Sequence, residues 1–226
     1  MSDGPVYRTE RQEARFFVYK MTNDSGAAPC VEGRVLSLAI CKPQIRKSAR
    51  VGDIIFGFAA KSLHPDNRLI YVAKVTEVVP DGRYYKDQRF KGRKDRIYAY
   101  RDGGYVRRNN ALFHARPEDL VHDLGAGPGH AAAVVLLSGE FRYFGGSGTN
   151  GYKARPPLRA LVEGFGRGHR VNHDPDVLKE LQRLKRNLWA TTRAGKSGRP
   201  TTPPKPRACH RGGSSVIVCR QLPSAR

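Results

Sequence analysis

Residues 36–58, LSLAICKPQIRKSARVGDIIFGF, predict the arrangement around which the rest of the chain is organised. An apolar, β-prone run ends at Cys41, and Pro43 stands where a first helical residue is tolerated because its missing N–H would be unpaired there anyway. Residues 51–53, VGD, are turn formers, and a second apolar run begins at Ile54. The segment therefore predicts a strand, a short basic helix, a turn and a second strand.

The start of this short helix is a candidate anion site. Free N–H groups at a helix start attract phosphate, and here they would lie beside Lys42, with Arg46 one turn further on. The alternative is a solvated basic connector between two core strands, and the sequence supports the two interpretations equally. Lys42 and Arg46 are therefore candidate phosphate ligands.

The chain carries a large excess of positive charge. Its 226 residues include 41 Lys and Arg against 20 Asp and Glu, which gives a formal net charge of +21. Residues 191–226 contain eight of the basic residues and no acid, so most of the excess belongs to the part before them. Such an excess favours a polyanionic partner, with nucleic acid ahead of an anionic membrane surface.

Several β-prone runs and one amphipathic helix predict the fold class. The helix is expected at residues 174–190, where Asp174 can cap it, Pro175 is a favoured first residue, and Leu181 and Leu188 belong to an apolar stripe. Because few helices separate the strands, we expect an α+β fold: a small, curved, mixed β-sheet, or one closing into a barrel, with the helix packed on it. The strands are expected at residues 16–21, 36–40, 54–58, 69–79, 132–138 and 141–144.

The chain divides into three parts by composition. Residues 1–14 are expected to be a flexible arm, residues 15–190 the folded core, and residues 191–226 a disordered basic tail rich in Pro and Gly. The start is polar, and the longest apolar run, residues 131–137, is too short to span a bilayer. Four cysteines without a C-x-x-C pair fit reduced thiols. We therefore expect a cytoplasmic protein with no membrane partner.

Basic and aromatic residues are interleaved between residues 84 and 108. Arginine binds phosphates, and an aromatic ring that stacks on a base contributes about 1–3 kcal/mol. The alternative is that the tyrosines cover a sheet with their hydroxyls in water, but the net charge favours binding. The cluster consists of Tyr84, Tyr85, Arg89, Phe90, Arg93, Tyr98, Tyr100, Arg101, Tyr105, Arg107 and Arg108.

A glycine-rich loop is a further candidate for phosphate binding. Gly145, Gly146 and Ser147 follow Phe144 at the end of a predicted strand, and glycine lets the backbone approach a ligand closely. No Lys-Ser/Thr pair follows, so the loop is not a P-loop. A tight turn explains the loop equally well.

A second glycine-rich loop lies at residues 164–170, GFGRGHR. Its Arg167 and Arg170 are candidate phosphate ligands, and His169 is a candidate acid or base near neutral pH. The favoured alternative is a polar loop that leads into the helix.

Acid–base chemistry has four candidates: Lys42, His64, Asp66 and His169. They would form a catalytic group only if the fold brought them into one pocket. Cys41, at a strand end beside a helix start, is a candidate nucleophile, although a small buried thiol is the favoured interpretation. The chain has no H-E-x-x-H or C-x-x-C spacing, so no metal site is expected and no cofactor is assigned.

The order of the segments resembles the second type of nucleotide modification associated domain, found in bacteria and phages. The resemblance implies an association with modified-nucleotide systems and names no particular reaction. It covers roughly residues 16–172, and its most specific parts are the central CKP-x-IR…GD segment and FRYFGGSG. The matching segments are FFVYKM, LAICKPQIRKSARVGD, NRLIYVAKVTE, YYKDQRF, DRIYAY, LLSGEFRYFGGSG and GRGHR.

The strand pattern and the VGD turn are also similar to the PUA, ASCH and EVE group of small barrels. Members of that group bind RNA or modified DNA bases, and some ASCH members hydrolyse modified nucleosides. This similarity implies a PUA-like barrel for the folded core.

The expected function is a nucleic-acid-binding domain that recognises a nucleotide or a modified base in a basic and aromatic pocket. The alternative is an enzyme that modifies or hydrolyses a nucleotide in the same pocket, and a third possibility is a domain that binds a protein. The expected partner is DNA, RNA or a nucleotide. The expected binding residues are Lys42, Arg46, Tyr84, Tyr85, Arg89, Tyr98, Arg101, Phe144, Gly145, Gly146, Ser147, Arg167 and Arg170.

Overall fold

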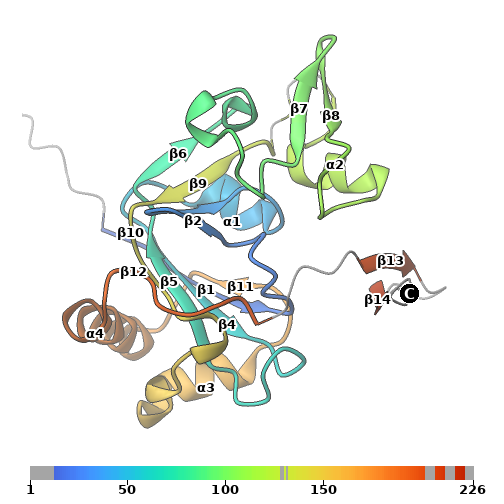
Figure 1. Cartoon of the computed structure of the whole chain (residues 1–226). Coiled ribbons are helices and arrows are strands. Elements are labelled where there is room, and N and C mark those ends of the chain that lie inside the picture. Colours follow the sequence, from blue (N-terminus) through green and yellow to red (C-terminus); the bar gives the residue numbers. More distant parts are fainter. Residues whose placement is uncertain (1–12, 128–129, 131, 202–206, 212–216, 222–226) are drawn as a thin grey trace, which may run out of the picture.

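A computed structural model describes residues 13–127, 130, 132–201, 207–211 and 217–221 of the chain. Two β-sheets pack face to face at its centre, two helices cover the outer face of the larger sheet, and a smaller lobe lies beyond the other sheet (Figure 1). Among the described residues neither sheet closes on itself. The expected α+β fold with a mixed sheet is confirmed, and the barrel alternative is not found.

The larger sheet mixes parallel and antiparallel pairs. β1 runs parallel to β4, whereas β4 and β5 are antiparallel, as are β5 and β10. Two short strands occupy the edges, β11 antiparallel to β1 and β12 parallel to β10. In spatial order the strands are β11 (His169–Arg170), β1 (Phe16–Met21), β4 (Ile54–Ala59), β5 (Leu69–Lys74), β10 (Glu140–Tyr143) and β12 (Gly195–Lys196).

The smaller sheet is antiparallel throughout. In spatial order its strands are β2 (Cys30–Glu32), β3 (Val35–Leu38), β9 (Val135–Ser138) and β6 (Glu77–Val79). The single strand expected at residues 69–79 is therefore divided between the two sheets. The chain changes sheets at Thr76, whose N–H donates to the carbonyl of Leu137 at 2.8 Å. A run of β-branched residues does not mark the point where a strand leaves one sheet for another.

The helices surround the two sheets. The α-helices are α1 (Pro43–Ser48), α2 (Pro117–Leu124), α3 (Pro156–Gly164) and α4 (Pro175–Thr191), and four short 3₁₀ helices occupy Arg83–Tyr85, Gln88–Phe90, Gly145–Ser147 and Gly151–Ala154. The helix expected at residues 174–190 is confirmed as α4. Asp174 stands at its N-cap but makes no side-chain capping bond, and the apolar stripe is buried as expected.

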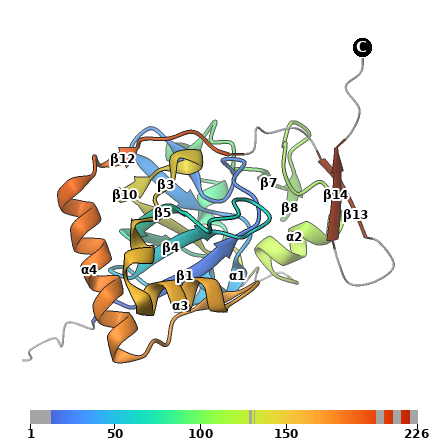
Figure 2. The ribbon, with the colours of Figure 1, turned by 90° about the horizontal axis from the view of Figure 1, so that it is seen from below.

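The larger sheet buries both of its faces. On the outer face Val18 and Phe56 pack with Leu158 of α3 and Leu184 of α4. Figure 2 shows both helices lying over this face of the sheet. Fully burying a leucine side chain contributes about 1.5–3 kcal/mol, so the stripe of α4 is a main attachment of that helix.

On the inner face of the larger sheet, Tyr19 and Tyr71 pack against the smaller sheet and against Ile45 of α1. The sequence segment from β3 through α1 to β4 therefore joins the two sheets. Cys41 lies in the connection between β3 and α1, at the point where the chain leaves the smaller sheet.

The packed chain continues beyond residue 190, where the sequence predicts the start of a disordered tail. The N–H of Ser197 donates to the carbonyl of Tyr143, and the N–H of Gly146 donates to the carbonyl of Arg199, both at 2.9 Å. These backbone bonds hold a segment that is too polar to bury a core of its own. Part of the segment expected to be a tail, residues 195–201, thus packs on the larger sheet.

The remaining parts of the chain are described only in pieces. Residues 1–12 of the expected arm, and residues 202–206, 212–216 and 222–226 of the expected tail, lie outside the described residues. β13 (Arg207–Arg211) and β14 (Ile217–Gln221) pair with each other. Within the described ranges, no helix has the length and apolarity needed to cross a membrane.

Candidate active site

Cys41, His114 and Asp123 form a hydrogen-bonded triad. The Sγ of Cys41 lies 3.1 Å from the Nε2 of His114, and the Nδ1 of His114 lies 2.5 Å from the Oδ2 of Asp123. The two ring nitrogens therefore face a nucleophile on one side and an orienting carboxylate on the other. The same order of nucleophile, imidazole and carboxylate performs nucleophilic catalysis on unrelated folds.

The backbone turns sharply at the thiol. Cys41 has a φ of 59° and Lys42 a φ of 45°, both in the left-handed region that residues with side chains rarely adopt. The N–H of Cys41 donates to the Oδ1 of Asp123 at 2.9 Å and so holds the turn. Such a conformation costs of order 1–3 kcal/mol for each residue and is concentrated at functional sites. Cys41 remains half-buried, whereas Cys30 is buried.

Asp123 is a fully buried carboxylate whose oxygens are well supplied with donors. Its Oδ2 accepts from the hydroxyl of Tyr98 at 2.8 Å as well as facing His114. Its Oδ1 accepts from the N–H of Cys41 and lies 3.8 Å from a guanidinium nitrogen of Arg46. These contacts satisfy both oxygens of the buried carboxylate and fix its direction toward the imidazole.

Arg46 is therefore not a phosphate ligand, contrary to the expectation from the sequence. Its side chain is fully buried and donates to the carbonyl oxygens of Cys41, Asp123, Ala132 and Val134 at 2.6–2.9 Å. With these donors engaged, the guanidinium supports the turn and α2 from inside. The sequence signals a basic helix, but only the packing of α1 decides which of its cations turns inward.

His114 is the acid–base group of the triad. Burial lowers its pKa, but hydrogen bonds to Asp123 and Cys41 and the charges of both outweigh this and raise the pKa to about 10. The imidazolium is therefore the form present at neutral pH. Its Nε2 lies within hydrogen-bond reach of the Cys41 thiol, which is the arrangement that an activated nucleophile requires.

The family described as nucleotide modification associated domain 2 matches residues 13–203. The chain belongs to this family. The resemblance expected from the sequence is confirmed, and it extends past residue 172 to include the segment that packs on the larger sheet. Searches of curated proteins and of solved structures found no match.

In this nucleotide modification associated domain, Lys42 lies beside the triad. Its Nζ is 4.9 Å from the ring centroid of Tyr19 and donates to the carbonyl of Lys20 at 3.3 Å. The pKa of Lys42 is lowered, chiefly by burial, while the charge of Cys41 opposes and the charge of Arg167 adds to the shift. The ammonium is thus close enough to the thiol to interact with its charge.

His169 lies on the same side of the domain, on β11 at the edge of the larger sheet. Its pKa is lowered by burial first, and then by the charges of Arg170 and Lys42. Two of the four expected acid–base candidates, Lys42 and His169, are therefore neighbours, and Arg167 interacts with one of them. Two cations, Lys42 and Arg167, therefore lie on the side of the domain that carries Cys41.

The other two acid–base candidates are engaged elsewhere. The Nε2 of His64 lies 3.2 Å from the hydroxyl of Thr201. Asp66 accepts from the guanidinium of Arg68 and from the side-chain amide of Asn150, and the bonds to Arg68 hold the pKa of its carboxyl well below the usual range. A carboxylate with so low a pKa is a weak base.

The expected stacking tyrosines form part of the core. Tyr84, Tyr85 and Tyr98 are at most 2% exposed, so none of them presents a ring to a ligand. Their hydroxyls are bonded inside the protein, that of Tyr84 to Asp95 and that of Tyr98 to Asp123. Tyr98 therefore acts on the site through the triad carboxylate. Amphipathic tyrosines pack in cores as readily as they stack on bases when their hydroxyls find partners.

The remaining expected ligands differ in their availability. Arg89 is exposed but bridges Glu77 and Asp87, which compensates its charge. Phe144 is buried, whereas Arg101 is exposed on β7 (Tyr98–Arg101). Arg167 and Arg170 are also exposed. The exposed arginines stay available to a ligand.

The first glycine-rich loop, residues 145–147, binds a later segment of the same chain. Gly145 has a φ of 55°, and a Cβ there would overlap with the carbonyl of Arg199. The N–H of Gly146 donates to that same carbonyl, and the N–H of Ser147 donates to the carbonyl of Phe144. Glycine is needed here because another backbone approaches closely, as expected. The approaching backbone belongs to residues 197–201 of the protein and not to a ligand.

The triad joins residues that sequence reasoning treated separately. Cys41 was a candidate nucleophile, with a buried thiol as the favoured interpretation, and Asp123 was not a candidate. A histidine and an aspartate nine residues apart, His114 and Asp123, carry no recognisable spacing. The clearest signal in the sequence was the position of Cys41 between a strand and a helix.

Proposed function

We propose that this domain is an enzyme that uses Cys41 as a covalent nucleophile on a nucleotide or on a base within a nucleic acid. The observation that carries the proposal is the triad, in which 3.1 Å separates the Sγ of Cys41 from His114 and 2.5 Å separates His114 from Asp123. The nucleotide as substrate rests on the family, whose description associates it with nucleotide modification.

Acyl transfer is the chemistry that fits this triad. The thiolate attacks a carbonyl carbon carried by the base, and the carbonyl electron pair moves to oxygen. When the pair returns, an amine or alkoxide leaves and takes a proton from the His114 imidazolium. Water then attacks the thioester and gives a proton to His114, and the thiolate of Cys41 leaves. One amide or ester bond is hydrolysed, and the enzyme returns to its starting state.

The cations beside the thiol support a phosphorylated substrate. These cations are Lys42, which interacts electrostatically with Cys41, and Arg167, which interacts with Lys42. No acid forms an ion pair with them in the described part of the chain. A phosphate is the group on a nucleotide that such a surface would hold.

Nucleic-acid recognition, the function expected first from the sequence, becomes the binding step of this proposal. Tyr84, Tyr85 and Tyr98 do not serve it, because their rings are in the core. Arg101, Arg167 and Arg170 remain its candidate phosphate ligands.

The reactivity of the thiol tests the proposal without knowledge of the natural substrate. Alkylation of Cys41 by iodoacetamide is followed by peptide mass spectrometry at pH 6, beside glutathione in the same solution. We expect Cys41 to react at least about tenfold faster than glutathione, because an imidazole within hydrogen-bond reach, oriented by a carboxylate, activates a thiol as a nucleophile. His114→Gln should abolish the difference, and Lys47→Gln, an exposed change on the same helix, should leave it.

A second measurement addresses the chemistry itself. Nucleosides and oligonucleotides acylated on an exocyclic amine are incubated with the protein, and the protein mass is recorded for a covalent acyl adduct. We expect an adduct that is absent with Cys41→Ser. A thiol no faster than glutathione in both the native protein and His114→Gln, with no adduct, would overturn the proposal.

A further inference from the structure

A β-hairpin stands apart from both main sheets. β7 and β8 (Gly104–Arg107) pair with each other, and in the described residues with no strand of the other sheets. Asp102 and Gly103 form the turn with φ values of 49° and 80°, as a two-residue type I′ turn requires. Figure 1 shows the hairpin projecting from the lobe that also carries α2. It is a projecting hairpin with a defined turn.

The hairpin and the loops at its base present cations without acid partners. Lys86 and Arg101 are exposed, and neither forms an ion pair within the described ranges. Arg89 in the same lobe, by contrast, is compensated by two carboxylates. Uncompensated cations gathered on one lobe create a positive potential that attracts a polyanion. The described part of this lobe also presents Arg83, Lys91, Lys94 and Arg108, none of which forms an ion pair there.

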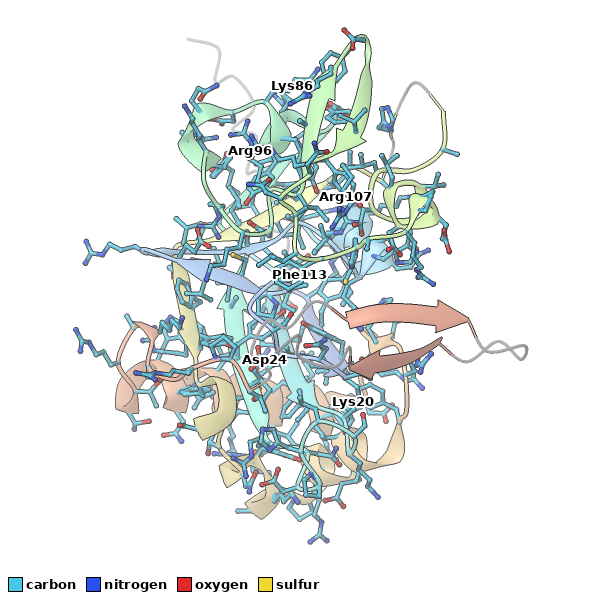
Figure 3. The ribbon with its side chains drawn as sticks, turned by 45° about the vertical axis from the view of Figure 1, so that its right-hand side comes forward. Lys20, Asp24, Lys86, Arg96, Arg107 and Phe113 are labelled. Atoms are coloured by element: carbon cyan, nitrogen blue, oxygen red, sulfur yellow. The ribbon has the colours of Figure 1, made fainter. Side chains whose placement is uncertain are left out.

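Tyr100 adds an accessible ring to these cations. It lies on β7, opposite Tyr105, and is 45% exposed, in contrast to the buried tyrosines of the same lobe. The Nζ of Lys86 is 3.6 Å from its ring centroid, and the ring of Tyr105 meets it edge-on at 5.1 Å. Figure 3 shows Lys86 beside the hairpin. A ring that is held in place, partly exposed and next to a cation is a platform on which a base can stack.

The base of the hairpin leads directly into the triad. Arg107, the last residue of β8, donates to the carbonyl of Phe113 at 3.2 Å and also to the carbonyl of Ala111. His114 is the next residue in the chain. Figure 3 shows Arg107 and Phe113 one below the other, between the hairpin and the larger sheet. A nucleic-acid strand bound along the hairpin would therefore continue toward Cys41.

We propose that the β7–β8 hairpin is a docking surface for the sugar–phosphate backbone of a nucleic acid, with Lys86 and Arg101 on phosphates and Tyr100 stacked on a base. The proposal goes beyond the thiol chemistry, because it assigns a polymer to a surface outside the triad and does not need Cys41 to react. An acidic protein would satisfy the cations but would leave the exposed ring without a base to stack on.

Binding is measured with the full chain carrying Cys41→Ser, so that no reaction intervenes. Fluorescein-labelled single-stranded DNA, duplex DNA and single-stranded RNA of equal length are titrated between 50 and 300 mM salt, as typical conditions for a salt slope. Lys86→Gln with Arg101→Gln removes two charges from the hairpin. Lys179→Gln with Arg186→Gln removes two exposed charges from α4 and is the matched control.

We expect the hairpin pair to weaken binding about tenfold or more and to lower the salt slope by about 2, since each lost phosphate contact removes roughly one counterion from the slope. The α4 pair should change affinity less than about twofold. Tyr100→Ala should weaken single-stranded binding by about tenfold, as expected for one lost stacking contact.

Three outcomes would overturn the docking surface. The first is an equal loss of affinity in the hairpin and α4 variants, which would mean general charge attraction. The second is an unchanged affinity of Tyr100→Ala for single-stranded nucleic acid. The third is binding of polyglutamate as tight as that of nucleic acid, which would mean a site for an acidic protein. Each is read from binding alone. Failure of the docking surface is therefore distinguishable from failure of the thiol chemistry, which alkylation of Cys41 reports.

Discussion

Arg46 and Asp123 meet inside the protein with both side chains fully buried, a guanidinium nitrogen 3.8 Å from Oδ1. The same guanidinium donates to the carbonyls of Cys41 and Asp123. One side chain thus ties together α1, α2 and the turn that presents the thiol. The charge of the triad carboxylate is balanced from the side opposite to the imidazole.

Arg46→Met is expected to lower the free energy of unfolding by about 3–5 kcal/mol, because it leaves four buried carbonyl oxygens without their donor and removes one of the two cations beside Asp123. Urea unfolding followed by circular dichroism measures the change. Lys47→Met, at the exposed neighbouring position of α1, should cost less than about 0.5 kcal/mol. Similar small losses in both variants would mean that the buried pair does not hold the site.

The raised pKa of His114 makes stability depend on pH in a defined direction. The ordinary pKa of 6.5 applies to the unfolded chain, and about 10 applies to the folded protein. Because the pKa of His114 is higher in the folded protein than in the unfolded chain, protonation of His114 stabilises the fold. This stabilisation is complete below pH 6.5 and is lost as the pH rises toward 10. The advantage of the native protein over His114→Gln should therefore shrink by up to about 1.4 kcal/mol per pH unit across this window.

Urea unfolding of the native protein and of His114→Gln, at steps from pH 6 to pH 10, checks this dependence. A difference in unfolding free energy that stays constant with pH would mean that the imidazole is not held protonated by Cys41 and Asp123.

The hydroxyl of Tyr98 is expected to act on the site through Asp123, to which it donates at 2.8 Å. Tyr98→Phe removes a buried bond to a charged acceptor and should cost about 1.5–3 kcal/mol of stability. It should also slow alkylation of Cys41, since the carboxylate loses one of the donors that orient it. Tyr100→Phe, which removes an exposed hydroxyl, should change neither quantity.

The segment after α4 is expected to come off the larger sheet when Gly198 is replaced. A Cβ at this position would overlap with the carbonyl of Phe144, so Gly198→Ala should destabilise by about 1–3 kcal/mol. Hydrogen exchange should accelerate at Ser197 and Gly146, whose N–H groups bond across this contact. Gly166→Ala, where a Cβ meets nothing within 4 Å, is the matched control and should leave exchange unchanged.

The local sequence pattern was sufficient to predict those helices and strands that depend on neighbouring residues. The order of strand, short helix, turn and strand in residues 36–58 is confirmed by β3, α1 and β4, and the stripe of α4 was recognised from its period. Composition and charge were likewise read directly, and the ordered segments were enough to recognise the family. These features follow from side-chain shape, turn chemistry and periodicity, which act over a few residues.

Only the tertiary structure decided which chemistry the chain carries. Cys41 and Asp123 are 82 residues apart in sequence, and no local rule pairs them. The inward orientation of Arg46 and the burial of Tyr98 both depend on the elements packed around them. A polar side chain is stable in the interior only where distant chain segments supply its hydrogen bonds. The sequence by itself determined a basic α+β domain of a nucleotide-modification family, and packing determined that a thiol, an imidazole and a carboxylate meet within it.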